Sequence, residues 1–377
     1  MSIPIITVAV IAAVSAIVEL PGAPAGPTST FGFIDSAPID PLEGIALEDV
    51  PEEVQAFMRN GQSWRAARLM RRFLEESPDP EPSAVLLAAR AEAGWGGWRN
   101  VLSYLEGEDW LNDVAGGEGW YWLARALEED DQREEAIAAY ERFRASSAGT
   151  DNEDQRLVAE LRQGLLLLEM GEMENGTALL TGIREEAPRI SPWVDLLAAE
   201  ALASRGDTAR VRNLVMPDEI GDLGARSRKA LFQAYREAGD IPTARMLALR
   251  FRASAASESE SAHFAAQAGH LALSEGDEEA ARPLFLAAIE AAPSSSAAGD
   301  AAEILEELGG LSPENLLAIA GVYDRRGRNE TAADRYTSWL ESGSGTAERR
   351  REVRLSLGRA LFDTGDYSAA AAALQPL

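Results

Sequence analysis

Residues 118–146 read EGWYWLARALEEDDQREEAIAAYERFRAS and contain two apolar runs with the spacing of one helix face. The apolar positions of the two runs are Trp120, Leu123, Ala124 and Leu127, followed by Ala136, Tyr140 and Phe143. A short polar break at Asp131 separates the runs. The stretch therefore predicts two antiparallel helices joined by a tight turn.

Breaks of this kind recur along the chain at intervals of 33 to 51 residues, and most intervals are close to 35. They fall at Gly61, Gly96, Asp131, Gly171, Gly206, Gly239, Gly276, Gly327 and Gly365. The longest interval, between Gly276 and Gly327, has room for an extra helix at Ala297–Leu308. Ser312 is then expected to cap the helix that follows.

The period and the residue types resemble the tetratricopeptide repeat family over residues 51–377. Small residues such as Gly269 and Gly358 stand where the two helices of a repeat touch, and large ones such as Phe285 and Tyr336 stand between repeats. The resemblance implies an all-α, right-handed superhelical solenoid of about nine helix pairs, the last one incomplete.

The N-terminal segment has a different composition. Residues 3–18 are almost continuously apolar, which predicts a signal peptide or membrane anchor within residues 1–20, although no Lys or Arg precedes the run. A buried core helix is the alternative. The Pro- and Gly-rich residues 21–50 indicate a flexible linker. We therefore expect an exported protein of the periplasm or cell envelope, which touches the membrane only through an uncleaved N-terminal segment.

Composition excludes several functions. Acidic residues outnumber basic ones by 62 to 35, so the net charge of −27 disfavours nucleic-acid binding. The chain has no Cys and two His, and we find no phosphate-binding loop, metal motif or nucleophile motif. We therefore expect no enzymatic activity, no cofactor and no metal in this chain.

A signal segment, a linker and an Ala-rich solenoid are together similar to the N-terminal part of soluble lytic murein transglycosylases. That resemblance implies peptidoglycan as a partner and a catalytic domain outside this chain. Glu260-Ser261 matches the start of the family's catalytic motif, but a repeat helix at Ala265–Ser274 follows it. We therefore carry no catalytic role over to Glu260.

In tetratricopeptide repeats the first helix of each pair lines a concave groove, and the resemblance carries its inward positions over to this chain. They include Tyr121 and Arg125 in the third repeat, Arg226, Lys229, Gln233 and Arg236 in the sixth, His263 and His270 in the seventh, and Leu355, Arg359 and Phe362 in the ninth. The sixth and seventh repeats would form a basic patch for a carboxylate or phosphate group of a protein or peptide partner. We expect the two His to gain charge as the pH falls through about 6.5. Charge balance against nearby Glu and Asp is the alternative.

A cluster of tryptophans, Trp95, Trp98, Trp110 and Trp122, lies between the second and third repeats. These side chains either pack between the two repeats or line a groove for an extended peptide or a glycan. The sequence as a whole favours a non-catalytic, exported binding scaffold, with the solenoid of a lytic transglycosylase as the alternative.

Overall fold

The computed structural model describes all residues except 1–40, 47, 49, 148–152 and 377. The described residues form helices and connections and contain no strand. They divide into two compact units, Met1–Arg205 with Ala209–Leu214, and Gly206–Thr208 with Val215–Leu377. The predicted signal segment lies outside the described residues, and no helix within them is both long and apolar enough to cross a membrane.

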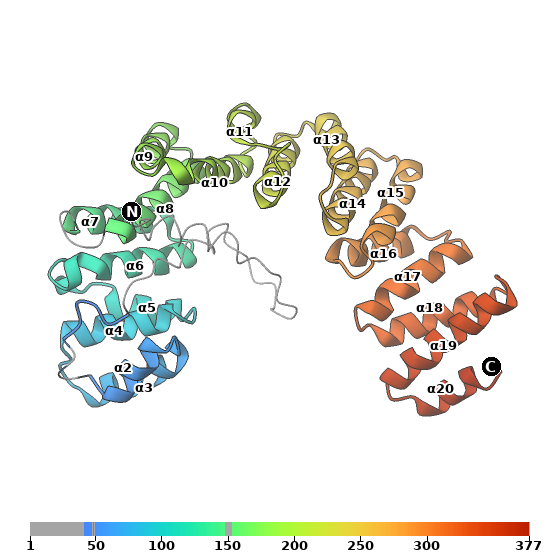
Figure 1. Cartoon of the computed structure of the whole chain (residues 1–377), viewed down its shortest axis with the longest axis horizontal. Helices are drawn as coiled ribbons and strands as arrows, with labels where there is room; N and C mark the ends of the chain where they lie inside the picture. The colour runs from blue at the N-terminus through green and yellow to red at the C-terminus, as the bar shows by residue number, and fades with distance from the viewer. Residues whose placement is uncertain (1–40, 47, 49, 148–152, 377) are drawn as a thin grey trace. The chain divides into compact units, whose positions relative to one another are not determined.

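Unit 1 is a stack of helix pairs (Figure 1). Its pairs are α2 (Glu52–Arg59) with α3 (Ser63–Glu76), α4 (Pro82–Ala93) with α5 (Trp98–Leu105), α6 (Glu118–Glu129) with α7 (Arg133–Ser146), α8 (Glu153–Met170) with α9 (Met173–Glu186), and α10 (Ser191–Ala203) with α11 (Thr208–Leu214). The stretch that opened the sequence analysis is thus one helix pair, as its apolar spacing predicts.

Unit 2 continues the same pattern with one addition. Its helices are α12 (Asp222–Glu237) with α13 (Ile241–Ala253), α14 (Glu258–Ser274) with α15 (Glu278–Ala291), the single helix α16 (Ser296–Leu308), α17 (Pro313–Arg325) with α18 (Asn329–Glu341), and α19 (Ala347–Asp363) with α20 (Tyr367–Leu374). The extra helix is confirmed at α16. Ser312 caps α17 as predicted, because its hydroxyl accepts a hydrogen bond from the Asn315 N–H at 3.2 Å.

All nine predicted breaks adopt the left-handed backbone that ends a first helix. Eight of them are glycines, which enter this region without a Cβ clash. Asp131 takes the same conformation with a φ of 60°. The nine turns join nine helix pairs within the described residues, so the predicted repeat count is confirmed.

Small residues allow the helices of a pair to approach closely. In the pair α8 and α9, a Cβ on Gly176 would lie 2.8 Å from the Gly164 carbonyl oxygen. In the pair α14 and α15, a Cβ on Gly269 would lie 2.8 Å from the ring of Phe285. Both distances are too short for a real side chain, so the packing of these pairs requires glycine.

The end of the predicted linker packs against the first helix pair. Leu42, Ile45 and Val50 are buried in one cluster with Val54 of α2. The packed region therefore begins before Pro51, because these apolar side chains find a core that their Pro- and Gly-rich surroundings do not reveal.

Buried ion pairs join successive first helices, and two of them have the same geometry. Arg228 of α12 donates to both carboxylate oxygens of Glu260 in α14, at 2.7 and 3.0 Å, and to the Pro217 carbonyl at 2.7 Å. Arg90 of α4 makes the same three-way contact with Glu118 of α6 and the Pro41 carbonyl. A planar guanidinium suits this arrangement because its fork matches a carboxylate. The same device thus fixes the register of two repeats, one in each unit.

Candidate functional site

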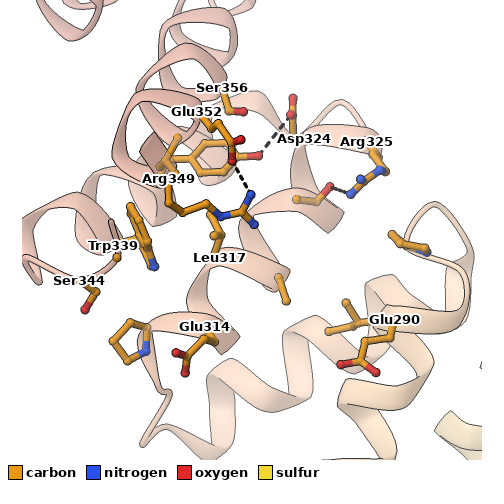
Figure 2. A pocket seen from close by; sticks show the side chains of 18 of the residues that line it. Glu290, Glu314, Leu317, Asp324, Arg325, Trp339, Ser344, Arg349, Glu352 and Ser356 are labelled. Atoms are coloured by element: carbon orange, nitrogen blue, oxygen red, sulfur yellow. Dashed lines mark hydrogen bonds and ion pairs between the residues drawn. The ribbon is translucent and has the colours of Figure 1, made fainter. Parts of the chain in front are cut away.

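A groove of about 770 Å³ lies within unit 2 (Figure 2). Its walls come from the first helices α17 and α19, and the C-terminal end of α15 closes one side. Tyr336 and Trp339 of α18 form its floor. Both aromatic side chains are buried, so the floor is rigid and apolar. We call this site the unit 2 groove.

Charged side chains line the walls of the unit 2 groove in intramolecular pairs. Arg349 donates to Glu352 at 2.6 Å, and Arg359 is hydrogen-bonded to Asp324 of the facing helix. Arg325 donates to the Gly321 carbonyl at 3.0 Å (Figure 2). The side chains of Arg349 and Arg359 are largely exposed. Such solvated pairs are weak, so the guanidinium groups remain accessible to an incoming carboxylate.

Asp324 connects the wall to the floor. It accepts a hydrogen bond from the Tyr336 hydroxyl at 3.3 Å in addition to its contact with Arg359. Burial and the nearby charge of Asp324 raise the pKa of Tyr336. Its neutral form is therefore favoured, and it donates this hydrogen bond to the floor-side carboxylate.

Exposed apolar residues lie on α19 beside the charged wall. Leu355 is 57% exposed and Phe362 is 61% exposed. The Phe362 ring contacts Tyr367 of α20 edge to face, with ring centroids 5.1 Å apart. Large exposed apolar groups on one helix are typical of an interaction surface. Arg359, Leu355 and Phe362 are the inward positions that the sequence assigns to the ninth repeat, and Arg359 lines the groove.

The predicted basic patch is brought together only in part. Lys229 and Arg236 of α12 are exposed, and their charges both act on His263 of α14. Arg236 also donates to Glu237 at 2.7 Å. Gln233 is half-buried between the two cations along α12. We keep the name basic patch for Lys229, Arg236 and His263.

The predicted histidine switch is wrong for His263. Burial, together with the charges of Lys229 and Arg236, lowers its pKa to about 4, and Glu260 opposes this only in part. His263 therefore stays neutral at mildly acidic pH. Burial also lowers the pKa of His270, while Asp300 raises it, and the ring of His270 contacts Phe285.

Other predicted positions are not available to a partner. Tyr121 is 3% exposed and packs among Trp122, Tyr140 and Phe143. Arg125 is fully buried, 5.0 Å from the Trp98 ring centroid and 3.3 Å from Glu128. These two groove assignments are wrong, because an ion-pair network and an aromatic cluster bury the inward face of α6.

Arg226 is half-buried near the start of α12. It makes interactions within the chain.

Glu260 has a structural role. Burial raises the pKa of its carboxyl, but hydrogen bonds from Arg228 and the Ala256 N–H outweigh burial and lower it overall. A carboxylate held ionised by an arginine cannot donate a proton to a leaving group. No group of three or more metal-ligating side chains occurs among the residues that the structure describes.

Arg325 and Arg349 line the groove but are not among the predicted inward positions. The only signal for them was the unusual run Arg349-Arg350-Arg351, three arginines in a chain of strong negative charge. Their convergence depends on the packing of α17 against α18 and α19, which the repeat period alone does not specify.

Two family models, both described as tetratricopeptide repeats, match residues 118–148 and 262–295. No curated protein matches the chain. Among solved structures, one similar chain is the Rap conjugation gene regulator of plasmid pLS20, in complex with the Phr* peptide. Its sequence is 11% identical, and the alignment covers 85% of this chain and 96% of the Rap chain, with a TM-score of 0.35. A human IFIT1 dimer with PPP-AAAA is 15% identical, covering 78% of this chain and 72% of its own, with a TM-score of 0.38. The repeat assignment rests on the two family models and on the helix pairs themselves.

Proposed function

Because two segments of the chain match tetratricopeptide repeat models, we propose that it is a protein-binding scaffold whose unit 2 groove receives an extended segment of a partner. The observation that carries the proposal is the groove of about 770 Å³ between α17 and α19, with its exposed arginines and the apolar residues beside them. Pockets of this size accommodate several side chains of a peptide.

The chemistry of the groove indicates the chemistry of the segment. Arg349 and Arg359 can donate hydrogen bonds to a carboxylate of the partner, either in place of their own acidic partners or in addition to them. Leu355 and Phe362 can bury an apolar side chain of the same segment. The expected partner segment is therefore extended, and carries at least one acidic and one apolar residue.

A second contact with the same partner is proposed at the basic patch. Lys229 and Arg236 are exposed cations on a chain of net charge −27. An anionic group of a partner would be attracted to this position and repelled by most of the remaining surface.

A peptide selection experiment tests the groove. Short random peptides are selected on the full chain, and the affinity of each binder is measured by fluorescence anisotropy. The double variant Leu355→Ser/Phe362→Ser should weaken binding more than tenfold, since each apolar contact is worth about 1–2 kcal/mol. The matched control is Met246→Ser/Leu249→Ser, which removes two exposed apolar residues from α13.

The two variants give a clear decision. Helix content should be unchanged in both, because all four side chains are exposed. If no selected peptide distinguishes the groove variant from the control, the unit 2 groove is not the binding site.

We further propose that the chain is exported and has no catalytic activity of its own. Export rests on the apolar residues 3–18. Expression in a bacterial host followed by N-terminal sequencing should find mature protein in the envelope fraction, starting after Ala16 or Ala25. Full-length protein with Met1 in the cytosolic fraction would contradict export. Peptidoglycan binding gains no support from the described residues and is not part of this proposal.

A further inference from the structure

Unit 1 contains an acidic cavity that the proposed function does not use. It has a volume of about 470 Å³, with a floor from α6 and walls from α7 and the connection between α5 and α6. Glu106 and Asp109 line one wall, and Glu135 lines the other. All three carboxylates are exposed to solvent.

Within the part of the chain that the structure describes, Glu106, Asp109 and Glu135 form no ion pair. Trp120 lies in the same cavity, and the Arg142 guanidinium lies 4.6 Å from its ring centroid. The cavity thus already holds one cation on an indole face, which is the geometry of a cation–π contact.

A second cavity of about 530 Å³ lies at the C-terminal end of α6. It is lined by Trp95 and Trp98, by Arg99, and by Glu129 and Asp130 at the end of α6. Leu123 and Leu127 of α6 line the first cavity, and Ala126 of the same helix lines the second. We call the two cavities together the unit 1 groove.

The charge of the unit 1 groove is strongly negative. Its acidic lining residues are Glu106, Glu108, Asp109, Glu129, Asp130 and Glu135. Its basic lining residues are Arg99 and Arg142. The lining indoles of Trp120, Trp98 and Trp95 already lie against arginines of the chain. The exposed carboxylates beside them are the groups that attract a further cationic side chain.

We propose that the unit 1 groove binds a segment of a protein partner that carries several lysine or arginine residues. One cationic side chain enters the cavity between Glu106, Asp109 and Glu135, and another reaches Glu129 and Asp130. The interaction is independent of the unit 2 groove, whose expected partner segment is acidic and apolar. A nucleic acid is repelled by the same carboxylates.

The test uses a fluorescein-labelled peptide of alternating lysine and glycine, with a glutamate–glycine peptide as the charge-reversed probe. Binding to the full chain is measured by anisotropy at about 0.15 M salt, where long-range attraction is screened. The lysine peptide should bind and the glutamate peptide should not. The triple variant Glu106→Gln/Asp109→Asn/Glu135→Gln should bind the lysine peptide about tenfold more weakly, since each solvated ion pair contributes up to about fivefold.

A variant of equal charge separates a site from general attraction. Glu279→Gln/Glu330→Gln/Glu341→Gln removes three exposed carboxylates from unit 2 and gives the same net charge as the first triple variant. It should bind the lysine peptide within about twofold of the unmodified chain. Equal weakening by both triple variants, or no binding of the lysine peptide to the unmodified chain, overturns the proposal. Circular dichroism of each variant confirms that the fold is retained.

Discussion

The substitution Arg228→Met should destabilise unit 2 strongly at neutral pH. The side chains of Arg228 and Glu260 are each 5% exposed, so the change leaves a carboxylate buried without its cation. Glu260 would keep only the Ala256 N–H, at 2.8 Å, and the Pro217 carbonyl would lose its donor. Removing one partner of a buried pair costs about 3–5 kcal/mol, a large part of the stability of a domain.

The double variant Arg228→Met/Glu260→Met separates the buried charge from the loss of packing. Methionine fills most of the vacated volume, and no uncompensated charge remains. The double variant should therefore lose only about 1–2 kcal/mol, for the hydrogen bonds at Pro217 and Ala256. Arg351→Met, at an exposed arginine of α19, serves as the control and should change stability by less than about 0.5 kcal/mol.

The loss in the single variant should also depend on pH. In the unmodified chain hydrogen bonds from Arg228 and Ala256 outweigh burial and lower the pKa of Glu260, so its ionised form stabilises the fold at neutral pH. Without Arg228, burial dominates and raises that pKa. The variant then recovers stability as the pH falls and Glu260 takes up a proton.

Hydrogen exchange measured on peptides from α12 and α14 is the suitable assay, because it reports the local opening of these helices separately from any unfolding of unit 1. The opening free energy of both helices should fall by about 3–5 kcal/mol in Arg228→Met. A single variant that loses less than about 1 kcal/mol, or a double variant as unstable as the single one, would refute the reasoning.

Three further predictions concern packing and titration. An NMR titration should find a pKa of about 4 for His263; because this lies below the unfolded value, its neutral form should contribute stability above pH 6.5 that declines by about 1–2 kcal/mol by pH 5. A midpoint near 6.5 would contradict the burial of this ring. Gly269→Ala should cost about 1–3 kcal/mol in urea unfolding, since its Cβ would lie 2.8 Å from Phe285; an unchanged midpoint would mean that α14 and α15 separate freely. Amides of α20, where only Ala370 is buried, should exchange faster than those of α18, and equal protection would show that α20 is covered in solution.

The sequence predicts the fold well because each repeat is specified by residues close together in the chain. Each turn needs a left-handed residue, and the glycines and Asp131 that supply it are visible without any structure. The extra helix at α16 follows from the length of one interval and the cap at Ser312. The packed residues Leu42 and Ile45 were missed because they stand in a stretch without helical periodicity.

The candidate site is less predictable because it depends on which side chains bury each other. Arg228 interrupts the apolar pattern of its repeat, and only its contact with Glu260 explains why. Arg125 has the spacing of a groove residue, yet Glu128 and Trp98 hold it in the interior. A burial-driven pKa, such as that of His263, likewise requires knowledge of every neighbouring charge.

The central claim is that the unit 2 groove is the binding surface of a scaffold. The most direct measurement is hydrogen exchange of the full chain with and without a selected peptide. The account predicts slower exchange in α17 and α19, which form the walls of the groove. Protection confined to other helices, or none at saturating peptide, would contradict it.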